Sequence, residues 1–264
     1  MQNKKPNFAK KVIKVMLIAT FWILIWEAAS RIVSSNNELL LLILPSPLTV
    51  IRKWFEIAFT SSFIKAEFYT LSRIFIGFLC GSFVGFLLGI LTHISKILYS
   101  LLSPILKIIR AVPVVAIIIL LYLFFESSNL PILIVCLMVS PLIWQATNDG
   151  LKNTNIKILE MAHVYNISKI KTVFLIKLPS IIPNLITTCV NSLGLAWKSG
   201  VAAEVICLPK ISLGTLLWQV KGNVNFDEVY AVTLTVILLS IIIEFLLKFL
   251  CKKYLLKSGG NVND

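Results

Sequence analysis

Apolar stretches of about membrane-spanning length alternate with short polar segments along the chain. A helix needs about 20 apolar residues to cross the hydrocarbon of a bilayer. We therefore predict an all-α membrane protein that forms a single transmembrane domain over residues 1–264. Its six transmembrane helices are expected at about 12–33, 69–91, 104–125, 130–147, 182–206 and 229–250.

One polar stretch between apolar runs also has helical character, and it connects the fourth and fifth predicted spans. Residues 153–179 begin with good helix formers, and apolar side chains recur there at helical spacing. These side chains are Ile156, Leu159 and Ala162. They predict a helix over about 156–165. Asn166 follows at the expected tight turn, because asparagine tolerates the left-handed backbone conformation better than most residues with a Cβ.

A second short helix is predicted after this turn. Ser168 is a suitable N-cap, and residues 169–177 carry Ile170, Val173 and Phe174 on one side. Leu178 and Pro179 are expected to end the helix, because proline lacks an N–H donor and restricts the residue before it. The stretch is thus a helical hairpin that is rich in lysine.

Composition supports a membrane location. Hydrophobic residues make up 58% of the chain and charged residues 14%, whereas soluble proteins have about 45–50% and 25%. The net charge of +13 comes from lysines that flank the apolar runs and form no patch with interleaved aromatics, so a membrane surface explains it better than nucleic acid. Five cysteines without a CxxC pair and two isolated histidines predict neither a disulfide framework nor a metal site.

The distribution of basic residues predicts the orientation. Six spans place both termini on the same side of the membrane as the hairpin. Seventeen of the 25 Lys and Arg residues then lie on that side, and seven, including Arg73, lie on the other. Cytoplasmic segments carry the excess of Lys and Arg in membrane proteins. The hairpin and both termini are therefore expected in the cytosol.

The first span has an alternative interpretation. A basic start, an apolar run and Ala28-Ala29-Ser30 also resemble a signal peptide with a cleavage site. We favour a retained helix, because six spans keep both ends on one face and because Glu27 and Arg31 can pair at i,i+4. The amphipathic stretch 50–59 is too charged to span and is expected to lie along the outer surface.

The hairpin resembles the EAA loop of ATP-binding-cassette (ABC) importer permeases. The resemblance rests on Glu160-Met161-Ala162, the turn residue Asn166 and Ile176-Lys177-Leu178-Pro179. Met161 stands where alanine is usual in that family, and Asn166 where glycine is usual. The resemblance implies a coupling helix that docks on a cytosolic ATPase. The residues that would couple to the ATPase are Glu160, Met161, Ala162, Asn166, Ile176, Leu178 and Pro179.

Three other motifs extend this resemblance over residues 40–250, towards the nitrate, sulfonate and taurine branch of these permeases. They are Leu44-Pro45-Ser46-Pro47, Arg110-Ala111-Val112-Pro113 and Ala203-Glu204. The resemblance implies a permease in the cell membrane that imports a small solute, such as a nitrate-, sulfonate- or taurine-like anion or a vitamin precursor. Implied partners are a second permease copy or paralogue, two cytosolic ABC ATPases that hold ATP and Mg, and an extracytoplasmic solute-binding protein.

Polar side chains mark one face of the fifth predicted span. They follow each other at steps of three and four residues, which keeps them on one side of a helix. The stripe consists of Asn184, Thr187, Asn191, Gly194 and Lys198, and Trp197 and Glu204 form a neighbouring face. A lysine in a span must face protein or a water-filled cavity. These residues, Gly194 apart, are candidates for the translocation pathway; the alternative is that they form hydrogen bonds between helices.

Small residues mark one face of the second span. Glycine recurs there at every fourth position, at Gly77, Gly81, Gly85 and Gly89. We expect this face to pack closely against another helix, and we prefer that to a role in substrate binding.

The chain carries no motif for catalysis or nucleotide binding. It lacks the phosphate loop G-x-x-x-x-G-K-[ST] and the hydrolase motifs H-E-x-x-H and G-x-S-x-G. We therefore expect a permease that is not an enzyme and binds no cofactor itself. The alternative function is an ion-coupled secondary transporter or a small channel that needs no ATP, although such carriers usually have acidic or discontinuous-helix ion sites in paired repeats.

Overall fold

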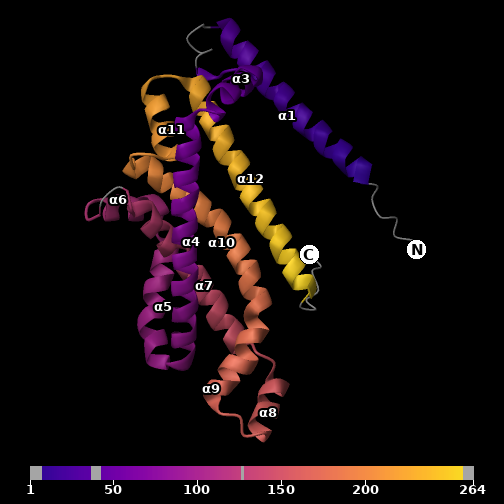
Figure 1. The fold of residues 1–264 in the computed structure, drawn as a ribbon, viewed down its shortest axis with the longest axis vertical. Coiled ribbons are helices and arrows are strands. Elements are labelled where there is room, and N and C mark those ends of the chain that lie inside the picture. The colour runs from indigo at the N-terminus through magenta and orange to yellow at the C-terminus, as the bar shows by residue number, and fades with distance from the viewer. Residues whose placement is uncertain (1–7, 37–42, 126–127, 258–264) are drawn as a thin grey trace. The chain divides into compact units, whose positions relative to one another are not determined.

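The computed structural model describes residues 8–36, 43–125 and 128–257, and all the regular secondary structure in these ranges is helical (Figure 1). The helices are α1 (Phe8–Asn36), α3 (Pro47–Ala58), α4 (Ser61–Ile94), α5 (Lys96–Ala111), α6 (Val114–Tyr122), α7 (Leu130–Lys152), α8 (Ile156–Val164), α9 (Lys169–Thr172), the π-helix η1 (Val173–Lys177), α10 (Leu178–Cys207), α11 (Leu213–Gly222) and α12 (Phe226–Lys257). Five are long and apolar enough to cross a membrane, and there are six spans if one bent pair counts as a span. The all-α membrane fold is confirmed.

The predicted third span is not one helix. The chain forms α5 and α6 instead, and their axes meet at 104°. Pro113 explains the break, because a proline pushes the preceding residue out of the helical conformation. Val112 accordingly has φ −76° and ψ 135°. The first part also starts earlier than predicted, because Ser95 caps α5 by accepting a hydrogen bond of 3.3 Å from the amide of Leu98.

The chain divides into two compact units. The first, Met1–Ile64 with Leu217–Thr235, contains α1, α3 and the start of α12. Its helix α3 begins at Ser46, which accepts a hydrogen bond from the amide of Thr49, so the amphipathic stretch predicted over 50–59 is a helix. Arg31 and Glu27 form the expected pair, with 2.7 Å between Nε and Oε1.

The second unit, Lys65–Leu216 with Val236–Asp264, is built around α7. Thirteen residues of this helix are buried, and α10 packs along it. The glycines of α4 also face α7. A Cβ at Gly77, Gly81, Gly85 or Gly89 would come within 2.4–2.8 Å of atoms in α7. Since side-chain carbons do not approach so closely, the absence of side chains on this face allows the two helices to touch.

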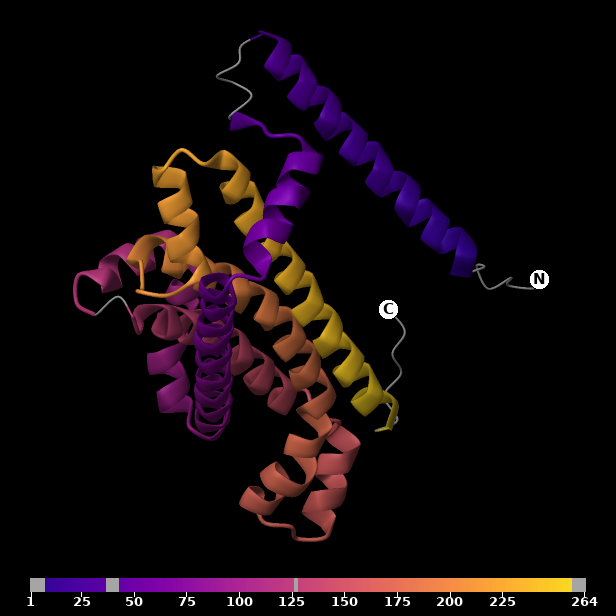
Figure 2. The ribbon, with the colours of Figure 1, turned by 45° about the horizontal axis from the view of Figure 1, so that its top comes forward.

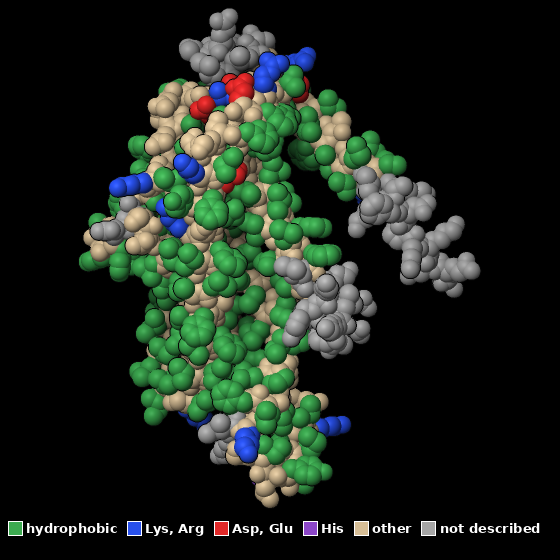
Figure 3. Space-filling model, in the orientation of Figure 1, with side chains coloured by type: hydrophobic (Ala, Val, Ile, Leu, Met, Phe, Trp, Pro, Cys, Tyr) green, Lys and Arg blue, Asp and Glu red, His purple; other side chains and the backbone are tan. Residues whose placement is uncertain are grey.

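A polar contact lies at the end of this helix pair. Thr92 accepts hydrogen bonds of 2.9 Å from the indole nitrogen of Trp144 and from the amide nitrogen of Asn148. All three side chains are buried. Figure 3 shows hydrophobic side chains over the middle of the view, where α4 and α5 lie, and Lys and Arg side chains toward its top and at its bottom, on the hairpin. This distribution is typical of helices that face lipid along their length.

Candidate functional site

The hairpin begins as predicted, with a short helix and a left-handed turn. Asn155 caps α8, and its side-chain oxygen accepts a hydrogen bond of 3.0 Å from the amide of Lys157. At the other end Asn166 has φ 52°. The amides of Asn166 and Ile167 donate to the carbonyls of His163 and Ala162, at 3.0 and 2.9 Å. This pair of hydrogen bonds is the Schellman motif, which satisfies carbonyls at the end of a helix.

The second half of the hairpin differs from the prediction. Ser168 does cap α9, at 3.5 Å from the amide of Lys171, but Pro179 does not end the helix. The chain continues from α9 through η1 into α10 without a break. In the π-turn the amide of Leu178 bonds to the carbonyl of Val173, five residues back. This wider turn shifts the hydrogen-bond register directly before Pro179, so the residue without an N–H lies where the regular pattern already changes.

The residues expected to couple to an ATPase differ in exposure. In α8, Glu160 and Met161 are exposed, whereas Ala162 is buried inside the hairpin. Of the others, Asn166 and Pro179 are exposed, and Ile176 and Leu178 are half-buried. Figures 1 and 2 show α8 and α9 side by side, beyond the ends of α7 and α10. Glu160 and Met161 are therefore available to a partner, and Ala162 holds the hairpin together.

The turn at Asn166 leads to a stability prediction for the hairpin. Asn166→Gly should leave the hairpin intact, because glycine adopts positive φ without strain. Asn166→Val should weaken the closed turn by about 1–2 kcal/mol, since left-handed geometry is costly for most residues. Amide hydrogen exchange of residues 156–172 would measure the change. We expect exchange to be faster than in the wild type in the valine variant and unchanged in the glycine variant. Equal exchange in both variants would contradict the prediction.

The polar stripe of α10 lies on an exposed face of the subunit. Asn184, Thr187, Asn191 and Lys198 are all exposed, and nothing lies within 4 Å of a Cβ placed on Gly194. Thr187 bonds only along its own helix, to the carbonyl of Pro183 at 3.1 Å. In a membrane such side chains need water or a polar partner. The stripe is therefore a surface that residues 8–36, 43–125 and 128–257 leave uncovered.

Trp197 and Glu204, grouped beside that stripe in the sequence, lie in the interior. Their side chains have 3% and 0% of their surface exposed. Trp197 donates a hydrogen bond of 3.2 Å to the carbonyl of Val236 in α12. Within this chain both residues therefore make contacts between helices, which is the alternative role considered for them.

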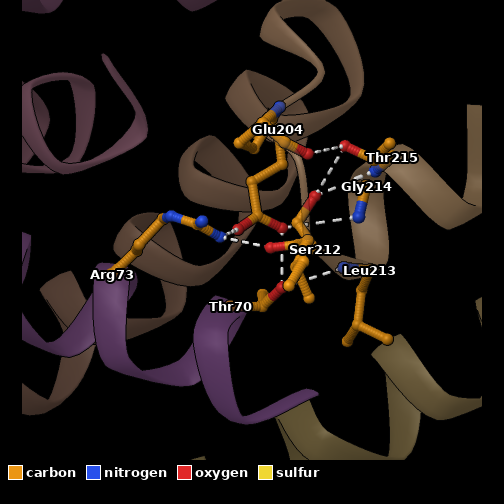
Figure 4. Close-up of polar contacts among 9 residues, drawn as sticks. Thr70, Arg73, Glu204, Ser212, Leu213, Gly214 and Thr215 are labelled. Carbon is orange, nitrogen blue, oxygen red and sulfur yellow. Dashed lines mark hydrogen bonds and ion pairs between the residues drawn. The ribbon is translucent and has the colours of Figure 1, made fainter. Parts of the chain in front are cut away.

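Glu204 is the centre of a buried polar cluster (Figure 4). One carboxylate oxygen accepts hydrogen bonds from the hydroxyl of Thr70 at 2.8 Å and from the amide of Gly214 at 3.4 Å. The other lies 3.2 Å from the guanidinium of Arg73. Arg73 also donates to the carbonyl of Ile211 at 2.8 Å, and the amide of Leu213 donates to Thr70 at 2.9 Å. We call Thr70, Arg73 and Glu204 the buried clamp, because they join α4, α10 and the start of α11.

The sequence carries a signal for this cluster in two charges of opposite sign. A buried charge must be paired, because burial of an unpaired charge is very costly. Arg73 in span two and Glu204 in span five are opposite charges inside apolar stretches, and each needs such a partner. Arg73, which the charge distribution groups with the outer residues, lies in the first half of α4, where its side chain is 14% exposed.

These features together define a helical membrane permease: several spans, an exposed hairpin rich in lysine, and a polar face on the span that follows it. Residues 77–255 match the sequence model of the family described as "Binding-protein-dependent transport system inner membrane component". The chain belongs to this family.

Similar proteins of known class agree with this membership. The putative aliphatic sulfonates transport permease SsuC of Bacillus subtilis is 27% identical over 77% of this chain and 73% of its own length. The nitrate import permease NrtB of Synechocystis is 24% identical over 92% of this chain and 89% of its own length. The taurine transport permease TauC of Escherichia coli is 25% identical over 80% and 79%.

Solved structures share the fold. An inward-facing form of the MetNI methionine ABC transporter superposes with a TM-score of 0.63, at 16% identity over 72% of this chain and 94% of its own. An amino acid ABC transporter crystallised with histidines gives 0.65, at 16% identity over 75% and 96%. The chain is thus the permease subunit of an ABC importer, and ATP is hydrolysed by a separate ATPase chain. Family membership sets aside the ion-coupled carrier considered from the sequence.

Proposed function

We propose that two such permease chains, identical or paralogous, work with two cytosolic ATPases and one solute-binding protein on the outer side of the cell membrane. The hairpin and both termini lie in the cytosol. ATP and Mg are held by the ATPases, and this chain binds no cofactor. The single observation that carries the proposal is the unbroken path α9–η1–α10. It joins the hairpin directly to the helix with the polar stripe, so movement of the hairpin moves that stripe.

The exposed stripe of α10 supplies the pathway in this proposal. Asn184, Thr187, Asn191 and Lys198 would face the same stripe of the second permease across a water-filled route. Trp197 and Glu204 are left out, because both are buried within one chain. Lys198 adds a positive charge to the route. The imported solute would therefore be a small anion, in keeping with the sulfonate, nitrate and taurine permeases to which the chain is similar.

Stimulation of ATP hydrolysis would identify the solute. The permease would be purified with its ATPase and binding protein, reconstituted in vesicles and offered nitrate, sulfonates, taurine and a pyrimidine vitamin precursor in turn. One solute should raise the rate of hydrolysis and enter the vesicles only when ATP is present. Uptake without nucleotide hydrolysis, or labelling that puts residues 153–179 on the outer face, would refute the proposal.

Charge reversal at Glu160 tests the docking surface. Glu160→Lys should weaken association with the ATPase at least about tenfold, because loss of one charge-assisted contact costs roughly 1.5–3 kcal/mol. Asp149→Lys makes the same charge change at an exposed carboxylate of α7 and should leave binding to the ATPase normal.

Lys198→Met should also assemble normally but should transport the anion more slowly. Normal assembly of Glu160→Lys, or unchanged uptake by Lys198→Met, would remove the corresponding assignment.

A further inference from the structure

A cavity of about 420 Å³ lies between the end of α4 and the hairpin. Three segments far apart in the sequence line it. They contribute His93 and Ile94 from α4, Ala162 and His163 from α8, and Phe174 and Lys177 from η1. The cavity is separate from the exposed stripe of α10, since its lining contains none of the stripe's residues.

The polar part of this cavity is basic. The ammonium of Lys177 lies 3.0 Å from Nε2 of His93. At that distance a charged lysine donates to a neutral imidazole, and two of its three N–H donors are left for other partners. Lys152 is close enough for its charge to act on the same histidine. No carboxylate is found among the described residues that line the cavity, so the positive charge is not balanced there.

The rest of the lining is apolar. Ile94, Leu159, Ile167, Val173 and Phe174 form most of the wall, and Ile94 and Phe174 are 64% and 55% exposed. A small inorganic anion would satisfy Lys177 but would leave this wall in contact with water. A ligand that has both an anionic group and an aliphatic part satisfies both, since ligand sites combine an apolar wall with a few placed polar groups.

We propose that this cavity binds the headgroup of an anionic phospholipid, with the phosphate at Lys177 and His93 and the acyl chains along Ile94 and Phe174. Basic pockets beside transmembrane helices are suited to such headgroups. The lipid would bridge α4 and the hairpin and so restrain the hairpin from the membrane side. The site does not depend on the identity of the solute; that it opens to the inner leaflet rests on the proposed topology.

Retention of phosphatidylglycerol tests the site. The intact complex would be extracted from membranes that contain this lipid, and native mass spectrometry would count the lipids kept on each permease chain. Lys177→Gln should retain at least about fivefold less lipid than the wild type, the effect of one basic residue near an anionic headgroup. Lys177→Arg should retain it. Lys171→Gln, an exposed lysine of the same hairpin outside the cavity lining, should match the wild type.

Two further arms separate this lipid from other occupants. His93→Gln, which removes the imidazole that accepts from Lys177 and holds it at the cavity, should also lose lipid, and its melting temperature would show that the complex is folded. Inorganic phosphate, added alone, should not displace the lipid. Equal lipid retention by Lys177→Gln and the wild type would overturn the proposal. Displacement of the lipid by inorganic phosphate would also overturn it. If lipid were found only after removal of the ATPase, the cavity would instead be assigned to an ATPase side chain.

Discussion

Arg73→Leu is expected to lower the free energy of unfolding by about 3–5 kcal/mol, the cost of removing one partner from a buried ion pair. The carboxylate of Glu204 has no exposed surface, so without Arg73 it would hold its charge with only the Thr70 hydroxyl and the Gly214 amide as donors. The start of α11 would also lose the bond between Arg73 and the carbonyl of Ile211. Reversible unfolding in mixed detergent micelles would measure the loss.

A double variant distinguishes the buried clamp from a simple packing effect. Replacement of both charges by apolar residues often costs less than removal of one. Arg73→Met combined with Glu204→Leu should therefore be more stable than Arg73→Leu. Glu244→Gln is the matched control, because its pair with Lys248 is exposed on both sides and should contribute nothing measurable. If the single and double variants were equally unstable, the charges of the clamp would not be the cause.

Gly85→Ala is expected to destabilise the protein by about 1–3 kcal/mol or more, the range for overpacking a core. The added Cβ would lie 2.4 Å from the carbonyl oxygen of Ser140. That atom belongs to the backbone of α7 and cannot move without shifting the helix. The same substitution at Gly194, where nothing lies within 4 Å, should be neutral or stabilising by up to about 1 kcal/mol, because alanine favours a helix over glycine.

The pair of glycine variants is informative because the chemical change is identical and both sites are helical. Thermal melting of each variant in detergent would give the sign and the order of the two effects. A Gly85→Ala protein as stable as the wild type would show that α4 and α7 do not touch in the membrane. A strong loss at Gly194 would instead indicate that the second permease packs against this position.

The sequence predicts the fold well where local rules decide. Long apolar runs identify the spans, because the bilayer accepts few other structures. The hairpin turn follows from Asn166, and the close face of α4 from glycines at every fourth position. These features depend on residues near one another along the chain, so that periodicity and backbone preference are sufficient to find them.

Contacts between distant segments were not predictable in the same way. Pro179 is a normal signal to end a helix, and only the π-turn at Val173–Lys177 lets the chain continue. Pro113 looks the same in sequence, yet there the chain does bend, by 104°. The partner of Glu204 lies 131 residues away in the chain. The depth of each charge and the neighbour that each proline meets are set by tertiary packing, which periodicity does not contain.

The absence of a joint between α9 and α10 has a mechanical consequence. The part of α10 after Pro183, residues 184–207, contains no further proline, and at 1.5 Å per residue it forms a regular helical rod about 36 Å long. Tilting the lysine-rich end by a few degrees therefore swings Glu204, near its far end, through several ångströms, as a lever amplifies a small input. The ion pair between Glu204 and Arg73 would resist that displacement. The largest movement caused by the ATPase would therefore occur at the end of α10 that is farthest from the hairpin.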